Sequence, residues 1–512
     1  MKKIKFLVSF ILGASFLCLS LNTINQSEKA LAEIVINDND KVRMPVVSFG
    51  ADSSTTMTFT WSTTNYTNTV VEIVEDTKDF IYENIKQYFG TIEVNKVGGG
   101  EGYIHRVIID DLTPNTKYKY KVGDPSLEMS EIGIFKTSST TGNVSFLHIS
   151  DPQGTTESDY LSYNNLLKTA TSNFDYDFVA LTGDIVNNSW AGSQPVHKQW
   201  EWALTNQFDV LKNYPVMAVA GNHEAASYDF SSHFTYQTSD AKQENGIYYS
   251  FTYNGVYFLA LNTNEGMASE PGSSLSLEQM EFIRNDLELH KDAKWKIVLM
   301  HKGIFDGGSH SSNLAEGEDY DIAYYRNDLA HLFSEYNVDL VLQGHDHLYS
   351  RSYPIYSSSL DGTVTHNPDV NVTSEEFNGV EYLHKPNGPI YFNTGSASGS
   401  KFYSPNMSEE MAGYIQHSAN PIAKLFTNIE IDQENDRLSF ITYKQENNSY
   451  ELYQSFGINK GELLNVETNI TPPEEPTEYN IPLIITLSVV GGVVLVLGLT
   501  LLITLFIKRR KK

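Results

Sequence analysis

Five short apolar segments between residues 144 and 343 each run into a polar residue that can bind a metal. The segments have the length of buried β-strands, and helical patterns separate several of them. The residues after these segments are Asp151, Gly183-Asp184, Gly221-Asn222-His223-Glu224, His301 and Gly344-His345-Asp346-His347. In α/β domains, sites form outside the carboxyl ends of the strands. The sequence therefore predicts one site built from five strand ends.

The types of these residues indicate a metal site. One match alone would also fit an ordinary turn, but five in order favour a shared function. His345 and His347 are separated by one residue just past a strand, so they can reach two neighbouring ions. Carboxylate, amide and imidazole ligands without thiolate suit Mn, Fe or Zn. The only cysteine, Cys18, lies in an N-terminal apolar run, so neither disulfides nor thiolate ligands are expected in the mature chain.

The two ends of the chain predict its location. Residues 1–32 combine early lysines, an apolar run and an A-x-A site, which is typical of a cleaved signal peptide; an uncleaved anchor is the alternative. Residues 481–507 carry no charge and can form a transmembrane helix, and the basic tail 508–512 is expected in the cytoplasm. Residues 458–480 read as a spacer. We expect a single-pass protein with an extracellular catalytic domain, resembling the surface proteins of Gram-positive bacteria.

The main body divides at about residue 141. Residues 33–140 alternate short apolar and polar runs, which predicts an all-β sandwich. Residues 142–457 predict an α/β domain with helices over 160–172, 197–211, 276–290 and 324–336, and with a rim loop over 357–387. The net charge of −27 disfavours binding to nucleic acid. An anionic substrate would therefore need a local positive centre.

The order D…GD…GNHE…H…GHxH resembles that of the calcineurin-like metallophosphoesterases. The similarity is closer to purple acid phosphatases, because residues 347–351 read H-x-Y-x-R and residues 112–120 resemble the tyrosine corner of a fibronectin type III domain, with Trp61 as its core tryptophan. The resemblance implies a four-layer α/β/β/α sandwich preceded by a fibronectin III-like domain.

The resemblance also implies roles for the strand-end residues. One metal would be held by Asp151, Asp184 and His347. The second would be held by Asp184, Asn222, His301 and His345. Two divalent or trivalent ions (Fe, Mn or Zn) would share a hydroxide that attacks phosphorus. His223 would contact the phosphate and assist the leaving group, and His310 would act as a proton donor.

Two positions depart from the family pattern. Purple acid phosphatases have a glycine where this chain has Gln153, and a tyrosinate where it has Asn187. Gln153 could ligate a metal through its carbonyl, bond a metal-bound water or cap a turn. Without the tyrosinate, a non-purple enzyme is expected. Both changes reduce the number of anionic ligands in the site formed by Asp151, Asp184 and His347, which predicts weaker metal binding there.

These observations predict a cell-surface phosphoesterase that hydrolyses phosphomonoesters in the manner of acid phosphatases. A phosphodiesterase or nucleotidase of the same fold is one alternative. A catalytically weakened adhesion or scaffold protein is another, which the fibronectin-like domain and Gln153 would permit. The sequence leaves the oligomeric state open.

Overall fold

The computed structural model describes residues 38–95, 101–187, 195–225, 229–236, 247–265, 274–312, 321–446 and 449–463. The predicted signal peptide, most of the predicted spacer, and the predicted membrane helix with its basic tail lie outside these residues. No helix within the described ranges is long and apolar enough to cross a membrane.

After the short helix η1 (Asp38–Asp40), the first domain is a sandwich of two four-stranded antiparallel sheets. One sheet has the order β1 (Arg43–Phe49), β2 (Met57–Thr63), β6 (Tyr103–Ile109), β5 (Thr91–Val94). The other has the order β4 (Lys86–Phe89), β3 (Val70–Glu75), β7 (Lys117–Gly123), β8 (Gly133–Lys136). Trp61 is buried on β2, and the Tyr118 hydroxyl accepts a hydrogen bond from the Thr113 N–H at 3.0 Å. This is the backbone bond of a tyrosine corner.

The second domain contains two large mixed sheets. The eight-stranded sheet has the order β11 (Val216–Ala218), β10 (Phe178–Leu181), β9 (Val144–Ile149), β23 (Lys424–Asp432), β24 (Arg437–Glu446), β25 (Ser449–Asn459), β20 (Val380–His384), β19 (Ser374–Phe377). The seven-stranded sheet has the order β12 (Tyr249–Tyr253), β13 (Val256–Ala260), β14 (Lys296–Lys302), β15 (Leu340–Gly344), β21 (Ile390–Asn393), β16 (Tyr349–Ser352), β22 (Ile415–Ala419).

The two sheets pack face to face, and their outer faces carry helices. Phe146 of β9 and Phe178 of β10 meet the ring of Phe258 of β13 edge-on, at centroid distances of 5.6 and 5.4 Å. Ile297 of β14 belongs to this inner core, whereas its neighbour Val298 packs in a second core with helices α8 (Leu277–Leu289) and α9 (Asp321–Glu335). Because successive strand residues point to opposite faces, a strand buried on both sides needs the continuous apolar run seen in the sequence.

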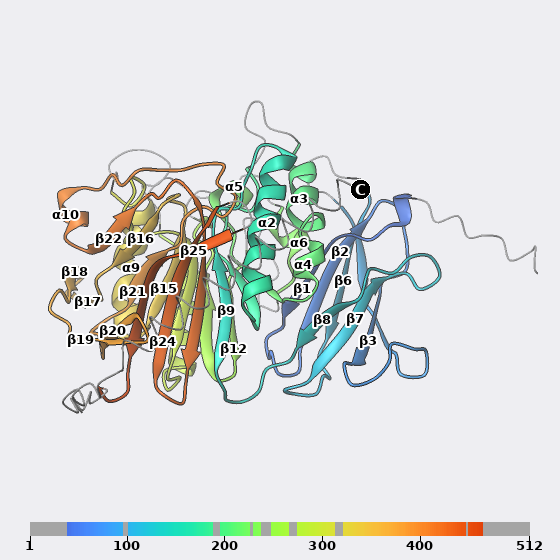
Figure 1. The fold of residues 1–512 in the computed structure, drawn as a ribbon, viewed down its shortest axis with the longest axis horizontal. Coiled ribbons are helices and arrows are strands. Elements are labelled where there is room, and N and C mark those ends of the chain that lie inside the picture. Colours follow the sequence, from blue (N-terminus) through green and yellow to red (C-terminus); the bar gives the residue numbers. More distant parts are fainter. Residues whose placement is uncertain are drawn as a thin grey trace, which may run out of the picture. The chain divides into compact units, whose positions relative to one another are not determined.

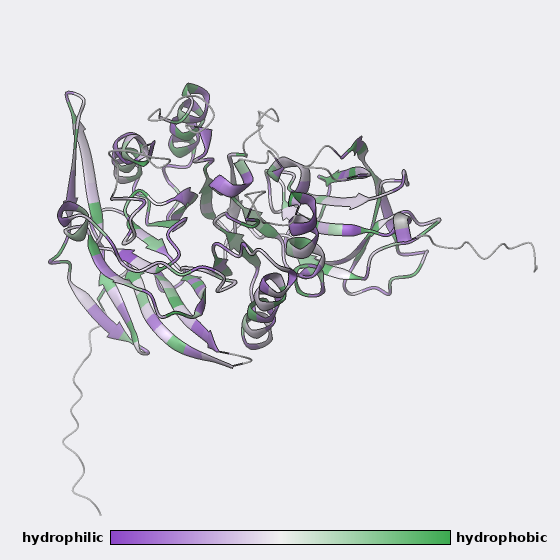
Figure 2. Cartoon of the chain, turned by 90° about the horizontal axis from the view of Figure 1, so that it is seen from above, coloured by the Kyte–Doolittle hydropathy of each residue, from purple (hydrophilic) through white to green (hydrophobic). Residues whose placement is uncertain are grey.

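Helices also cover the eight-stranded sheet beside the first domain. Helix α2 (Glu157–Asn173) packs its buried side chains into the same contiguous hydrophobic cluster as the strands of this sheet, and α3 (Val196–Thr205) and α4 (Phe208–Leu211) contact β1 (Figure 1). The remaining short helices are α5 (Asn222–Ala225), α6 (Phe230–His233) and α10 (Glu409–Ala412). Apolar and polar segments alternate along the helices (Figure 2), as expected for amphipathic helices that cover a sheet. The arrangement agrees with the predicted purple acid phosphatase-like fold.

The two domains share one apolar core. Phe49 of β1 lies 5.7 Å from the ring of Phe178 and 5.1 Å from that of Tyr253. The Ser48 hydroxyl donates to the Val216 carbonyl at 2.8 Å. The first domain is therefore fixed directly to strands that carry the site residues described below.

Three local predictions differ from the structure. The helix predicted over 197–211 is divided into α3 and α4, because the Gln207 side chain turns inward and donates to the carbonyls of Tyr160 and Trp202. The predicted rim loop contains the hairpin β17 (Ile355–Leu360) and β18 (Thr363–Pro368), followed by β19 and β20. Strand β25 continues to Asn459, into the predicted spacer, where it pairs with β20 and β24.

Candidate metal centre

The predicted site residues lie where strands of both sheets end. Strands β9, β10 and β11 run parallel, and so do β13, β14, β15 and β21. Asp151, Asp184 and Asn222 follow β9, β10 and β11, while His301 lies near the end of β14, and His345 and His347 follow β15. Parallel strands deliver their carboxyl ends to one edge, so the six residues come together although almost 200 positions separate the first from the last.

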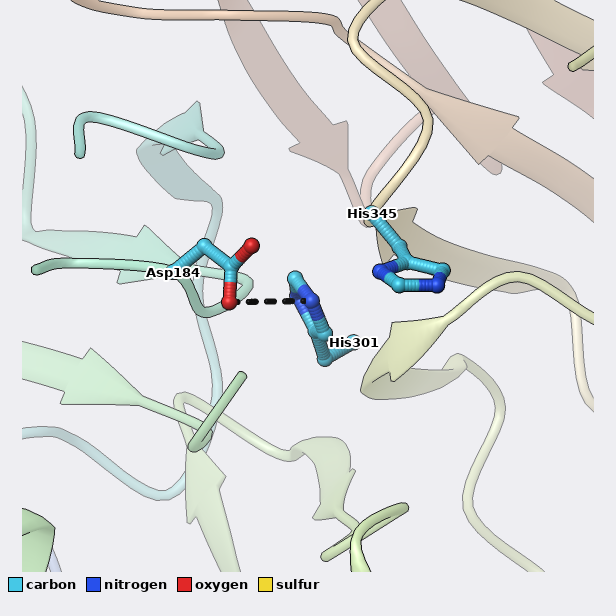
Figure 3. Close-up of side chains that lie close together, drawn as sticks. All are labelled: Asp184, His301 and His345. Atoms are coloured by element: carbon cyan, nitrogen blue, oxygen red, sulfur yellow. Dashed lines mark ion pairs between the residues drawn. The ribbon is translucent and has the colours of Figure 1, made fainter. Parts of the chain in front are cut away.

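One group of ligand atoms comes from Asp184, His301 and His345. All three side chains are buried, and one atom from each lies within 4.8 Å of the others. The His301 Nε2 atom is 3.2 Å from Asp184 Oδ1 and 3.0 Å from Asn222 Oδ1. Figure 3 shows the three side chains projecting from separate segments toward the space between them. Asn222 thus adds an amide oxygen to this group.

A second group comes from Asp151, Asp184 and His347, again buried and within 4.8 Å of one another. His347 Nε2 lies 3.5 Å from Asp151 Oδ1. Asp184 belongs to both groups, and its two oxygens have different neighbours. Its Oδ1 atom faces His301, whereas its Oδ2 atom accepts a hydrogen bond from Gln153 Nε2 at 2.7 Å. A carboxylate with this arrangement can bridge two metal ions.

The chemistry of these donors fits a pair of metals of the Mn, Fe or Zn type. The ligand atoms are carboxylate oxygens, imidazole nitrogens and an amide oxygen, in two groups that share one carboxylate. The six residues predicted as metal ligands are therefore brought together, and their roles as ligands stay predictions.

The backbone of the centre adopts unusual conformations. Asp151, Asp184 and His345 have φ values of 50°, 51° and 74°, in the left-handed region that costs a non-glycine residue about 1 kcal/mol or more. Glycine neighbours permit the close approach of these turns. A Cβ atom on Gly221 would lie 2.1 Å from Asp184 Oδ1, and one on Gly344 would lie 2.7 Å from the Thr182 carbonyl oxygen. The glycines that precede the ligands are thus required sterically.

Glu224 holds two of these turns in place. Its buried carboxylate accepts hydrogen bonds from the N–H groups of Asp184 at 2.9 Å, Val186 at 2.9 Å and Gly221 at 2.7 Å. It therefore orients the strand ends that carry Asp184 and Asn222. Glu224 thus affects the site by holding the backbone of the ligand residues, because its carboxylate is the acceptor for three buried backbone N–H groups.

Burial and neighbouring charges set the protonation of the centre. Burial works to raise the pKa of Asp184, but His301 and His223 outweigh it and hold that pKa well below its usual range. Burial opposes a charge on His301, yet the Asp184 carboxylate raises the pKa of His301 to about 9. Burial lowers the pKa of His347 to about 3, and it raises the pKa of Asp151 to about 7 with help from Asp184. Asp184 is the dominant anion of the centre.

Each of the two predicted catalytic histidines lies beside a residue of the ligand groups. His223 Nδ1 is 3.1 Å from the Asn187 carbonyl oxygen, and its Nε2 is 3.7 Å from Asp184 Oδ2. His310 Nδ1 is 2.6 Å from Asp346 Oδ1, and the His310 ring lies 4.2 Å from that of His345 between centroids. Both imidazoles are in reach of a ligand bound at the centre.

The structure also adds residues that the sequence reasoning missed. Lys401 Nζ donates to Gln153 Oε1 at 2.6 Å, and the Tyr403 ring stacks on His347 with centroids 4.5 Å apart. Both residues follow β21, which runs parallel to β15 and ends at the same edge. The run of small residues at 394–400 after an apolar segment is a sixth strand end, and it could have indicated this loop.

Comparisons with known proteins agree with this geometry. Residues 144–349 match the calcineurin-like phosphoesterase family, and residues 43–137 match the purple acid phosphatase N-terminal domain. Purple acid phosphatase 21 of Arabidopsis thaliana is 28% identical over 272 residues, which are 51% of this chain and 56% of that protein. Acid phosphatase type 7 of Danio rerio is 26% identical over 362 residues, 67% of this chain and 75% of that protein. The chain thus spans little more than half the length of several of these relatives.

A solved structure has the same fold. The purple acid phosphatase PPD1 from yellow lupin (Lupinus luteus) seeds superimposes with a TM-score of 0.61 at 18% identity, over 82% of this chain and 75% of that one. The match extends across both described domains.

Proposed function

Because the chain combines a purple acid phosphatase N-terminal domain with a calcineurin-like phosphoesterase domain, we propose that it is a two-metal hydrolase of phosphate esters. The observation that carries this proposal is that Asp184 belongs to both groups of buried ligand atoms, with Oδ1 beside His301 and Oδ2 bonded to the Gln153 amide that also contacts His347. A pair of metals bound there would supply positive charge for the phosphate and would activate a water at neutral pH. This also provides the local positive centre that a chain of net charge −27 needs to attract an anion.

The histidines complete the proposed chemistry. The His223 Nδ1–H group donates to the Asn187 carbonyl, which leaves Nε2 directed toward the Asp184 side of the centre. There Nε2 can hold a proton for the departing oxygen of the ester. His310 is oriented in the same manner by Asp346 and can contact the phosphate or its leaving group. The family resemblance supports both roles.

We expect Asp346 to act by positioning His310. Asp346→Asn should lower kcat about 10-fold, corresponding to ~1.4 kcal/mol of transition-state stabilisation, and should leave KM and metal content unchanged. The reason is that the carboxylate fixes the ring through its 2.6 Å contact with Nδ1. Steady-state kinetics of Asp346→Asn, His310→Ala and the double variant test this. If the two losses multiply in the double variant, the residues act independently and the assigned role is wrong.

We propose phosphomonoesters as substrates and the outer cell surface as location. The first part rests on the acid phosphatase relatives, and the second on the predicted signal and anchor segments. A phosphate-release screen over nucleotides, sugar phosphates and phosphodiesters, with Mn, Zn and Fe supplied in turn, tests the substrate class. We expect kcat/KM for monoesters to exceed that for diesters at least about 10-fold; the reverse order would favour the phosphodiesterase alternative.

A further inference from the structure

The Gln153 amide lies inside the second ligand group. Gln153 is fully buried, and its Nε2 atom is 2.7 Å from Asp184 Oδ2 and 3.2 Å from His347 Nε2. An amide nitrogen carries two hydrogens, so it can donate to both atoms at once. It therefore engages the same lone pairs of Asp184 and His347 that a metal in this group would need.

Lys401 sets the orientation of this amide. Its ammonium group donates to Gln153 Oε1 at 2.6 Å, and it has no acceptor atom. If the amide were turned by 180°, its nitrogen would face the ammonium group and its oxygen would face the Asp184 carboxylate. Both new contacts would be repulsive. The Lys401 ammonium thus keeps the amide oxygen away from the ligand group and the amide N–H groups directed into it.

The backbone of Gln153 is also fixed. Its N–H donates to the Asp184 carbonyl at 3.0 Å, and its own carbonyl accepts from the hydroxyls of Ser398 at 2.9 Å and Ser400 at 2.5 Å. Because the backbone is held on both sides, a shift of the loop alone cannot move the side-chain amide of Gln153 out of the ligand group. A metal would have to displace the side chain or turn it against Lys401.

The other ligand group has the opposite arrangement. Asn222 directs its oxygen, Oδ1, to His301 Nε2 at 3.0 Å. Asp184 Oδ1 has His301 Nε2 at 3.2 Å and accepts from the His223 N–H at 3.2 Å, and no side-chain amide nitrogen is among its described contacts. The two groups share Asp184 and yet differ in whether an amide oxygen or an amide nitrogen points inward.

We propose that Gln153, held by Lys401, makes the centre asymmetric. The group Asp184, Asn222, His301 and His345 binds its metal tightly, whereas the group Asp151, Asp184 and His347 binds a weak, exchangeable ion that must displace the Gln153 amide. Lys401 is a positioning residue that lowers the affinity of this second site, both by orienting the amide and by adding a positive charge beside it. This inference rests on the proposed two-metal function.

The test is a titration of the metal-free full-length protein with Mn²⁺ by calorimetry, with elemental analysis of the bound ion. We expect two classes of sites whose Kd values differ at least about 10-fold. Lys401→Met, which keeps the apolar stem of the side chain, should strengthen the weak class about 10-fold and leave the tight class unchanged. Lys424→Met is the matched control, because Lys424 is also half-buried but donates to the Ser162 carbonyl instead. It should behave as the wild type.

A second variant shows whether a change in metal affinity comes from the orientation of the residue 153 side chain or from a loss of folding. Gln153→Glu places an oxygen toward the ligand group whichever way the carboxylate turns, and it retains an acceptor for Lys401. It should also strengthen the weak class. Two sites of equal Kd in the wild type, or an unchanged weak class in Lys401→Met, would overturn the asymmetry while leaving the two-metal function intact. A protein that binds no Mn²⁺ would overturn both.

Discussion

Replacing Asp184 by alanine is expected to remove both metals and to reduce phosphate release at least about 10³-fold, or ~4 kcal/mol of transition-state stabilisation. The physical reason is that Asp184 belongs to both ligand groups. A ligand that served a single ion would leave the other bound. Elemental analysis of the purified variant beside its kinetics distinguishes the two cases.

Asp184→Asn is a second variant for the same experiment, and it separates the loss of charge from backbone strain. Asp184 has a φ of 51°, and asparagine tolerates this left-handed conformation better than alanine does. The asparagine variant therefore removes the charge with little backbone strain, and it should still lose the weaker metal. Asp175→Ala, at an exposed carboxylate on the loop before β10, is the control and should keep both ions. Full metal content in Asp184→Ala would contradict the bridging role.

The second large effect is expected at His223. His223→Ala should keep both metals and lower kcat about 100-fold, because a positioned acid that protonates the leaving oxygen contributes to the transition state and not to metal binding. The loss should be larger for alkyl phosphates, whose leaving groups need a proton, than for nitrophenyl phosphate. Rates for a series of leaving groups, measured beside metal content, provide the test.

A matched variant is His331→Ala on helix α9, where the imidazole bonds the Asn327 carbonyl. It should leave both metal content and kcat unchanged. Metal loss in His223→Ala would show that this residue supports the ligand groups and does not act on substrate. An equal loss of rate across all leaving groups would show that it only orients the phosphate.

The strand-end pattern predicted the architecture well because it depends on a simple physical rule. Strands buried on both faces require continuous apolar runs, and parallel strands place the residues after their carboxyl ends at one edge of the sheet. That rule selected Asp151, Asp184 and Asn222 in one sheet and the three histidines in the other. The predicted resemblance is confirmed by the matches of residues 144–349 and 43–137 to the two domain families.

Other features had sequence signals that were overlooked. Asp361-Gly362 and Asn378-Gly379 have positive φ at both residues, which is the two-residue turn of a β-hairpin. Both dipeptides lie in the segment predicted as a rim loop, where they form the turns of β17–β18 and β19–β20. The hairpins were therefore readable from the sequence.

The strand end before residues 394–400 could have indicated the loop after β21, but not that Lys401 is the side chain that reaches Gln153. Lys401 reaches the centre because β21 pairs with β15 and because Ser398 and Ser400 attach the following loop to the Gln153 carbonyl. A tertiary contact of this kind leaves no periodic pattern. The sequence identified Gln153 as a departure from the family, but only its contacts with Asp184, His347 and Lys401 show that the nitrogen of its amide faces the ligands.

The most direct measurement is phosphate release from a chromogenic phosphomonoester by the purified protein after chelation and after addition of Mn²⁺ or Zn²⁺. The two-metal assignment predicts no hydrolysis in the chelated protein, and recovery of activity with up to two ions bound per chain. Absence of hydrolysis with every divalent metal, together with no bound metal by elemental analysis, would contradict it.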